Sequence, residues 1–421
     1  GEIFIALEGD KYNGVNFISE AFSKGALAAV VNKAATSEFK ACLLKVDDSL
    51  VAFGKIAKEY RQRFNIPIIS VTGSNGKTTT KDMISCILGY KFRVLSTCRN
   101  ENNLIGVPKT LFRLKEEEFA VLEVGTDRPG EIGCLSDIIK PKIGVITNIG
   151  HSHLEGLADI DGVLREKTEM LEHISNDGVW VRNLDDELLS VFDFNSREQL
   201  TFSIEREDAD FFASNISQLA EGIEFDLIVS GKGGARFFLP MLGRHNVCNA
   251  LAAITACSRY VGIDEMVDAF GSFEPAPMRM QLLNKKNIRI IDDTYNANPL
   301  SLRKAVLTLK SLPTQGRRVL VCGDMLQLGG FSEILHREAG RFIASQGLDL
   351  LVTIGLQVDF LSNSALHNGM DKRRVNHFKS KTETVDFLCK TIVAEDVLLF
   401  KGSRAMKMED VIECFINSFT P

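Results

Sequence analysis

The stretch from Ile68 to Met83, IISVTGSNGKTTTKDM, constrains this chain more than any other. Its β-branched start is typical of a strand, its two glycines allow a tight turn, and the residues after them favour a helix. The backbone N–H groups of such a turn point inward, and a helix N-terminus attracts anions. The stretch therefore predicts a phosphate site on an α/β sheet. The alternative is a turn without a ligand, but a bare turn needs no Gly-Lys-Thr-Thr-Thr run.

The glycine spacing of this stretch is that of a shortened phosphate loop, with only Ser74 and Asn75 between the two glycines. Lys77 is predicted to reach the outer phosphates of a nucleotide, and the Thr78 hydroxyl to bind a magnesium ion. The residues expected to contact the nucleotide here are Thr72, Gly73, Ser74, Asn75, Gly76, Lys77, Thr78 and Thr79.

Composition indicates a soluble globular protein with more than one core. The chain has 421 residues, of which 45% are hydrophobic and 25% charged, and this length suggests about three domains. The net charge of -6 disfavours a nucleic-acid or anionic-membrane partner. No apolar run is long enough to span a bilayer, and the N-terminus has no basic segment leading into an apolar one. We expect a cytoplasmic protein that acts as a monomer.

The pattern of strands and helices predicts three α/β domains. Residues 1–64 form a small unit, and Gly1 is not a start methionine, so we expect native residues to be missing before it. Residues 65–272 alternate apolar strands with helical patterns, which favours a mostly parallel sheet, with an antiparallel portion near 200–240. Residues 273–421 alternate in the same way and predict a second doubly wound unit. The nine cysteines form no C-x-x-C pair and are predicted to be reduced core residues.

Three more candidate residues follow predicted strands, where open α/β sheets bind their ligands. Glu123 ends the strand AVLEV, and a carboxylate beside a phosphate loop suits Mg²⁺, which prefers oxygen ligands. His153 follows the strand IGVITNIG, together with His151. Lys167 lies in the helix after them, where an exposed helix lysine is the plainer interpretation.

These motifs, taken together, resemble the Mur ligases of peptidoglycan synthesis. The resemblance rests on TGSNGKTTT, LEVG, NIGHSHLEG, GRHNVCNALAA, DDTYNANP, GDMLQLG and KGSRAMKME in this order, and it covers nearly the whole chain. It implies three domains: residues 1–64 hold the uridine-diphosphate end of the substrate, residues 65–272 bind ATP, and residues 273–421 are Rossmann-like. It also implies an ATP-dependent amide ligase that joins D-alanyl-D-alanine to UDP-N-acetylmuramoyl-tripeptide through an acyl phosphate.

The resemblance also implies roles for single residues. Lys77, Thr78, Glu123, His153 and Lys167 match the catalytic groups. Thr78 and Glu123 match the ligands of one Mg²⁺, and His153 and a carbamylated Lys167 match those of a second. Asn249 matches the residue that meets adenine, and Arg279 and Asp293 match groups that close over the nucleotide. The residues carried over to the peptide and dipeptide substrates are Asn102, Asn103, Asn296, Lys401, Ser403 and Arg404.

The chain departs from the family pattern at a few positions, and other functions stay open. The family often has a glycine before its matching arginine, and this chain has Met278 there. KGSR after a strand could also simply cap the next helix. Three alternatives remain: a folylpolyglutamate synthetase, another Mur ligase, and a nucleotide-gated binding protein that hydrolyses ATP to change shape. Amide formation would distinguish a ligase from the last of these.

Overall fold

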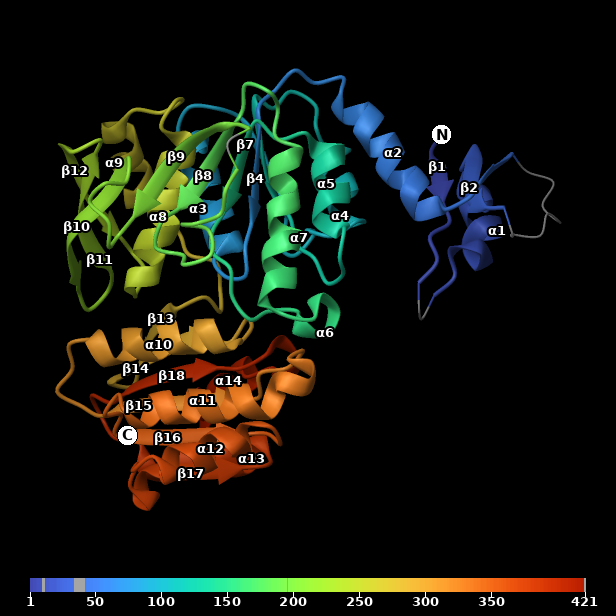
Figure 1. The fold of residues 1–421 in the computed structure, drawn as a ribbon. Helices are drawn as coiled ribbons and strands as arrows, with labels where there is room; N and C mark the ends of the chain where they lie inside the picture. The colour runs from blue at the N-terminus through green and yellow to red at the C-terminus, as the bar shows by residue number, and fades with distance from the viewer. Residues whose placement is uncertain (10–11, 34–41, 195, 420–421) are drawn as a thin grey trace.

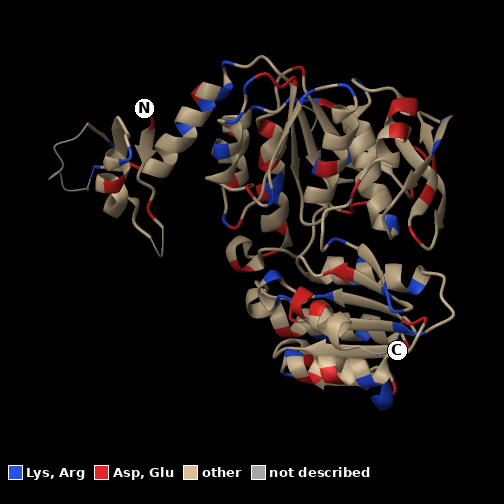
Figure 2. Cartoon of the chain, turned by 180° about the vertical axis from the view of Figure 1, so that it is seen from behind, with Lys and Arg blue, Asp and Glu red and all other residues tan. Residues whose placement is uncertain are grey.

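The computed structural model of the chain describes residues 1–9, 12–33, 42–194 and 196–419. Its strands form three sheets, of three, nine and six strands, which follow one another along the chain (Figure 1). We name the parts built on these sheets the first, central and third units. The predicted α/β fold with three such units is confirmed. Segments coloured for Lys or Arg and for Asp or Glu alternate along the ribbon of all three units (Figure 2).

The first unit is a parallel sheet in the order β1-β2-β3, with a small core around Ile18 and Val31. Its strands are β1 (Ile3–Ile5), β2 (Ala28–Asn32) and β3 (Leu43–Val46), and its helices are η1 (Gly14–Phe17), α1 (Ile18–Ser23) and α2 (Ser49–Arg61). Asp48 caps α2 by accepting from the N–H groups of Leu50 and Val51. From Phe53 onward α2 packs on the central unit (Figure 1), where Phe53 contacts the Phe112 ring and Lys58 pairs with Asp137 at 2.6 Å.

The central unit is a nine-stranded sheet in the order β12-β11-β10-β9-β8-β7-β4-β6-β5. Its strands are β4 (Ile68–Thr72), β5 (Val94–Ser96), β6 (Phe119–Glu123), β7 (Ile143–Ile146), β8 (Val179–Asn183), β9 (Glu198–Ser203), β10 (Phe211–Gln218), β11 (Ile223–Val229) and β12 (Lys232–Leu239). Its helices are α3 (Lys77–Gly89), α4 (Gly106–Leu111), α5 (Glu131–Ile139), α6 (Leu154–Leu157), α7 (Ile160–Glu172), α8 (Arg244–Cys257) and α9 (Ile263–Gly271). Ile68 packs on the face with α5 and α7, and Ile69 on the face with α3 and α8, as the alternation of a strand requires.

The antiparallel portion of this sheet begins later than predicted. The segment LTFSI belongs to β9, which pairs parallel to β8 and also to β10. Antiparallel pairing is found between β10 and β11 and between β11 and β12. Strand periodicity shows which residues share a face but says nothing about the direction of the neighbouring strand, so the sequence could not reveal this crossover.

The third unit is a six-stranded sheet in the order β13-β14-β18-β15-β16-β17, parallel except for the hairpin β13-β14. Its strands are β13 (Gln281–Lys285), β14 (Ile288–Asp293), β15 (Arg318–Gly323), β16 (Leu350–Ile354), β17 (Val375–Phe378) and β18 (Val397–Lys401). Its helices are α10 (Pro299–Ser311), η2 (Gly329–Phe331), α11 (Ser332–Ala344), α12 (Val358–His367), η3 (Lys372–Arg374), α13 (Lys381–Thr391), η4 (Arg404–Met406) and α14 (Glu409–Ser418). Helix α10 lies on the side that faces the central unit (Figure 1).

The cysteines are free, as predicted, but not all of them are core residues. Cys257 and Cys322 are buried, whereas Cys42, Cys98, Cys134 and Cys414 are exposed. The apolar run around a cysteine predicts an element, and its own side chain can still face the solvent side of that element. Among the described residues, no helix combines the length and apolar character needed to cross a membrane.

Candidate active site

The predicted phosphate loop is a turn between β4 and α3 that only glycine can form at two positions. Gly76 has φ +81°, and a Cβ atom there would lie 2.3 Å from Asn249 Oδ1. Gly73 has φ +142°, and its Cβ would lie 1.9 Å from Thr147 Oγ1. The loop is therefore pressed between the end of β7 and helix α8, and side chains at these positions would displace it.

Lys77 begins α3 and is folded back over the loop. Its Nζ donates to the Gly73 carbonyl at 2.7 Å. Burial lowers the pKa of Lys77, and while the charge of Glu123 opposes this shift, that of Arg279 adds to it. The ammonium group is thus held at the loop in a poorly hydrated place, where its attraction for a phosphate is strong.

Thr78 and Glu123 are joined in a chain of hydrogen bonds that crosses two units. Thr78 Oγ1 donates to Glu123 Oε2 at 2.7 Å, and Asn102 Nδ2 donates to Glu123 Oε1 at 2.8 Å. From the third unit, Arg279 Nη2 donates to Thr78 Oγ1 at 2.9 Å. Arg279 also stacks over the Tyr295 ring, with its guanidinium carbon 4.0 Å from the ring centre. The third unit is therefore docked on the phosphate loop.

The backbone around Arg279 is unusual. Met278 and Met280 on either side of it have φ +60° and +54°, in the left-handed region that favours glycine. A glycine is often found at the position of Met278 in the family that the sequence resembles, and this conformation gives a physical reason. The strained residues Met278 and Met280 thus flank Arg279, which reaches across the boundary between the third and central units.

His153 lies at the start of α6, with its Nδ1 2.8 Å from Asp127 Oδ1. Its pKa is lowered to about 4, mainly by burial and in part by the charges of Lys77 and Lys167, while Asp127 opposes the shift. The imidazole is therefore neutral near pH 7. With Nδ1–H donating to Asp127, its Nε2 keeps a lone pair for a ligand.

Lys167 is fully buried in α7, and burial lowers its pKa to about 7. The charge of Lys77 contributes to this lowering, whereas Glu166 and Asp127 oppose it. A buried amine near pKa 7 is partly neutral under ordinary conditions and can therefore react as a nucleophile. This environment differs from that of the exposed helix lysine that the sequence alone favours.

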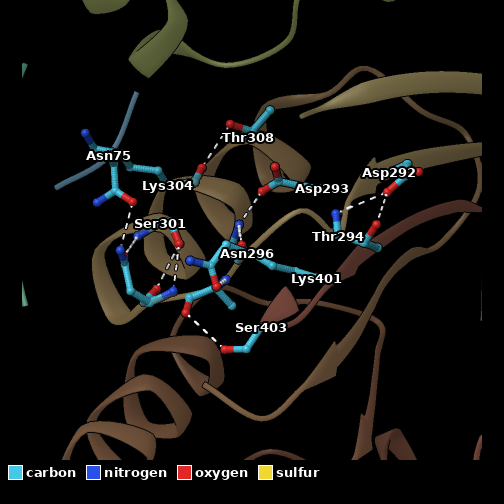
Figure 3. A network of polar contacts seen from close by, with 12 residues as sticks. Asn75, Asp292, Asp293, Thr294, Asn296, Ser301, Lys304, Thr308, Lys401 and Ser403 are labelled. Atoms are coloured by element: carbon cyan, nitrogen blue, oxygen red, sulfur yellow. Dashed lines mark hydrogen bonds and ion pairs between the residues drawn. The ribbon is translucent and has the colours of Figure 1, made fainter. Parts of the chain in front are cut away.

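On the opposite wall, Lys401 ends β18 and Asp293 ends the neighbouring strand β14. The two residues pair in register, and Lys401 Nζ lies 2.5 Å from Asp293 Oδ2. Lys401 Nζ also donates to the Asn296 carbonyl at 3.0 Å (Figure 3). Lys401 is buried and Asp293 is partly buried at the cavity wall, and their ion pair holds the loop from Asp293 to Asn296 at the carboxyl ends of the strands.

Most of the predicted site residues line one cavity of about 510 Å³ between the central and third units. Those that line it are Ser74, Asn75, Gly76, Lys77, Thr78, Thr79, Asn102, Asn103, Glu123, His153, Asn249, Arg279, Asp293, Asn296 and Lys401. A second cavity, of about 750 Å³, adjoins it and shares Asn148, His245, Asn249 and Lys304 with it. His151 is exposed and lines the second cavity.

Five predicted residues do not line the first cavity. Thr72 is buried at the end of β4, Gly73 packs on Thr147, and Lys167 lies behind His153. Ser403 is buried and accepts from the Leu326 N–H at 2.8 Å, and its side chain makes no cap for the helix after it. Arg404 is exposed and pairs with Glu409.

Comparisons with known proteins agree with this geometry. The Mur ligase middle domain matches residues 71–257, and the Mur ligase glutamate ligase domain matches residues 278–404. The chain belongs to the Mur ligase family. Its match to the UDP-N-acetylmuramoyl-tripeptide--D-alanyl-D-alanine ligase of Bacillus subtilis is 37% identical and covers 99% of this chain and 91% of that protein. The ligase of the same name from Escherichia coli is 34% identical over 100% of this chain and 92% of its own length.

Solved Mur ligase structures have the same architecture. Crystal structure I of MurF from Acinetobacter baumannii is 31% identical, with a TM-score of 0.90 over 99% of this chain and 91% of that one. MurF of Thermotoga maritima in complex with ADP has a TM-score of 0.89 at 27% identity, over 99% of this chain and 95% of that one. A folylpolyglutamate synthase of Mycobacterium tuberculosis shares the fold, at 16% identity and a TM-score of 0.65 over 87% of this chain and 93% of that one.

The oxygen ligands of this Mur ligase fit a magnesium ion that arrives with a nucleotide. Among the described residues, no group of three or more His, Cys, Asp or Glu side chains is placed to hold a metal. Thr78 and Glu123 nevertheless offer oxygens 2.7 Å apart at the phosphate loop. Mg²⁺ in such sites takes one or two protein oxygens and completes its shell with water and substrate phosphates.

Sequence reasoning missed several residues that hold this site together. Asp127 orients His153, and its signal was its place just after the strand that ends at Glu123. Asn148 accepts from the Asn75 N–H at 3.0 Å and donates to the Asn75 carbonyl at 3.0 Å. Asn298, in the motif DDTYNANP, reaches the phosphate loop from the third unit. Only contacts between distant segments reveal these roles.

Proposed function

We propose that this Mur ligase joins D-alanyl-D-alanine to UDP-N-acetylmuramoyl-tripeptide, with ATP as the energy source. The observation that carries the proposal is the Lys77, Thr78 and Glu123 group at a glycine loop, with Arg279 of the third unit bonded to Thr78. Such a group binds a triphosphate between two units, and the curated relatives that carry this ligase name match nearly the whole chain.

The reaction needs an activated acid, because a carboxylate does not condense with an amine in water. The terminal carboxylate of the tripeptide attacks the γ-phosphorus of ATP, and ADP leaves. The amine of D-alanyl-D-alanine then attacks the carbonyl carbon of the acyl phosphate, the amine loses a proton, and phosphate leaves. Negative charge gathers on the transferring phosphoryl group, so positioned positive charges lower the barrier.

Lys77 and Arg279 supply positive charge from the two walls of the cavity. Lys77 reaches the phosphates from α3, and Arg279 reaches them from the third unit, steadied by the Tyr295 ring. Thr78 and Glu123 would hold one Mg²⁺, and His153 with a carbamate on Lys167 would hold a second. Bound there, these ions would neutralise phosphate charge and orient the oxygens. Loss of one preorganised group in such a site costs about a hundredfold or more in rate.

A carbamate on Lys167 suits the local environment. Protonated, this lysine would repel a metal ion, whereas its carbamate offers anionic oxygens on a long side chain. Carbamate formation needs the neutral amine, and burial lowers the pKa of Lys167 to about 7, so the neutral form is well populated near neutral pH. His153, kept neutral by its own lowered pKa, would be its partner ligand.

The substrates would be divided among the units. The first unit, residues 1–64, would hold the uridine-diphosphate end, and residues 65–272 would bind ATP. The base of ATP would lie beside Asn249, toward the second cavity and its apolar side chains such as Phe202 and Leu300. Residues 273–421 would close over the nucleotide with Arg279 and Asp293. Asn102, Asn103, Asn296 and Lys401 would face the peptide, and Ser403 would support them from behind.

The test is phosphate release by the full chain with ATP, UDP-muramoyl-tripeptide and D-alanyl-D-alanine, each omitted in turn. We expect release that needs all three, together with a new amide in the product. Release without an acceptor would instead support a nucleotide-gated binding protein. An amide formed only with glutamate and a folate would support the folylpolyglutamate synthetase alternative.

A further inference from the structure

Two side-chain amides meet where the third unit touches the phosphate loop. Asn298 Nδ2, at the start of α10, donates to Asn75 Oδ1 in the loop at 2.9 Å. Asn75, which lies between Gly73 and Gly76 in the loop, lines the first cavity. In Figure 3 its carboxamide oxygen turns toward the start of α10 and its nitrogen turns away.

The orientation of both amides follows from one unambiguous donor. The Ser301 backbone N–H donates to Asn298 Oδ1 at 2.8 Å. A backbone N–H can only donate, so the atom of Asn298 that faces it must be the oxygen. The NH₂ group of Asn298 must therefore be the donor toward Asn75, and the side-chain oxygen of Asn75 must be the acceptor. This leaves the NH₂ group of Asn75 on the other side, as a donor.

That donor has no partner among the described residues. Asn75 Nδ2 is a buried atom without a hydrogen bond, although the peptide groups of Asn75 are both bonded. Asn148 Oδ1 accepts from the Asn75 N–H, and Thr147 Oγ1 donates to the Asn75 carbonyl at 2.6 Å. The backbone is therefore fixed, and the side chain contributes a buried donor beside the loop that needs an acceptor.

We propose that Asn298 is a positioning residue for ATP, which sets the carboxamide of Asn75 so that its NH₂ group, and not its oxygen, faces a phosphate oxygen. This inference rests on the proposed function, since the phosphate is that of ATP. Docking of α10 then has a chemical effect inside the loop. With the third unit away, Asn75 can turn either face to the phosphates, and its oxygen repels them.

The matched variants separate this role from helix capping. Asn298→Ser keeps a good N-cap for α10 but is too short to reach Asn75, whereas Asn298→Ala loses both functions. We expect Asn298→Ser to keep the melting temperature of the parent and to raise the KM for ATP about fivefold, with kcat within about twofold. Asn298→Ala should raise the KM equally and also lower the melting temperature.

A double-mutant cycle tests whether the effect passes through Asn75. Asn75→Ala should weaken ATP binding about tenfold, as expected for a lost hydrogen bond to a charged group. Adding Asn298→Ser to Asn75→Ala should change the affinity no further. An unchanged KM in Asn298→Ser, or an equal effect of Asn298→Ser with and without Asn75, would overturn the inference.

The readout also separates this inference from the proposed function. ATP affinity of the full chain, measured by calorimetry with Mg²⁺, does not depend on ligation. If the parent chain binds ATP but forms no amide, the proposed function fails while the amide pair is still tested. If the parent ligates and Asn298→Ser binds ATP normally, the amide pair fails alone.

Discussion

The two walls of the cavity are held in different ways. On the central wall, Thr78 lies in the first turn of α3, directly after β4, and Glu123 ends the neighbouring strand β6, which pairs with β4 so that Val71 is opposite Glu123. The wall from the third unit is joined to it through side-chain hydrogen bonds, from Arg279 to Thr78 and from Asn298 to Asn75. Both acceptors are neutral, and such bonds contribute only about 1 to 3 kcal/mol each.

This difference indicates how the work is divided. The backbone of the central wall is held within one sheet, so it can keep its arrangement whether or not the third unit is docked, whereas the carboxamide of Asn75 is set by docking. In the third unit, the ion pair of Lys401 and Asp293 holds the wall together. This unit can therefore move away from the central unit as a rigid body. Closure would then complete the site by adding Arg279 and by fixing the carboxamide of Asn75, while the backbone of both walls stays unchanged.

The largest expected effect is the loss of Lys77 from the central wall. Lys77→Ala should abolish ATP-dependent ligation, a loss of about a hundredfold or more, because the ammonium group at the Gly73 carbonyl is lost and Arg279 reaches the site only from the third unit. Phosphate release measures the activity, and the melting temperature should stay close to that of the parent. Lys81 is the matched control: it is buried one turn later on α3 and donates to the Thr97 carbonyl at 3.0 Å. Lys81→Ala should keep most of the activity, and near-normal turnover in Lys77→Ala would refute the site.

Next is Lys167, which lies behind the same wall. Lys167→Ala should be inactive, and a short carboxylic acid should restore part of the activity by standing in for the carbamate oxygens. Phosphate release with and without added acid measures the rescue. The parent chain should in addition show a carbamate carbon signal when labelled bicarbonate is supplied. If neither bicarbonate nor small acids affect the parent or the variant, the carbamate is absent.

A smaller effect should come from the wall of the third unit. Lys401→Met leaves the partly buried Asp293 carboxylate without its partner, which costs less than the about 3 kcal/mol of a fully buried pair, so we expect lower stability together with weaker ligation. Arg404→Ala is the control, since its exposed pair with Glu409 contributes about 1 kcal/mol at most. Urea unfolding and phosphate release measure both. A loss of activity in Arg404→Ala as large as in Lys401→Met would show that Arg404 enters the site.

The smallest expected effect is a pH dependence from His153. Its pKa is about 4 in the folded chain and ordinarily 6.5, so between these values the unfolded chain binds a proton that the folded chain does not. The free energy of unfolding should therefore fall as pH falls from about 6.5 to about 4, by an amount on the order of 2 kcal/mol. Urea unfolding at several pH values should show a smaller fall in His153→Asn. Equal slopes for the two proteins would contradict the lowered pKa.

Local patterns in the sequence predicted a helix, strand or turn well where one physical cause determines the backbone conformation. Glycines followed by a helix start placed the phosphate loop, and β-branched runs placed β4, β6 and β7. The direction of β9 escaped prediction, because side-chain alternation is the same in parallel and antiparallel strands.

The candidate site shows the same division. Residues of the contiguous loop from Ser74 to Thr79 line the cavity together, because one turn fixes them all. In KGSR, Lys401 faces the cavity, while Ser403 turns to Leu326 and Arg404 to solvent. A motif that follows a strand end predicts that its residues lie near the site, but not which of their side chains point into it. Asp127 and Asn298 act through partners far along the chain, and no local pattern marks such pairs.

Helix α2 decides how the first unit stands relative to the nucleotide site. Leu50, in the first turn of this helix, lines the first cavity. From Phe53 onward the helix packs on the central unit, where Phe53 contacts the Phe112 ring and a Cβ atom at Gly54 would lie 2.9 Å from Ile138. In the proposed function, this packing sets the distance between the uridine end of the substrate and the carboxylate that reacts. A larger side chain at Gly54 would shift the first unit, and with it the length of peptide that fits between the two ends.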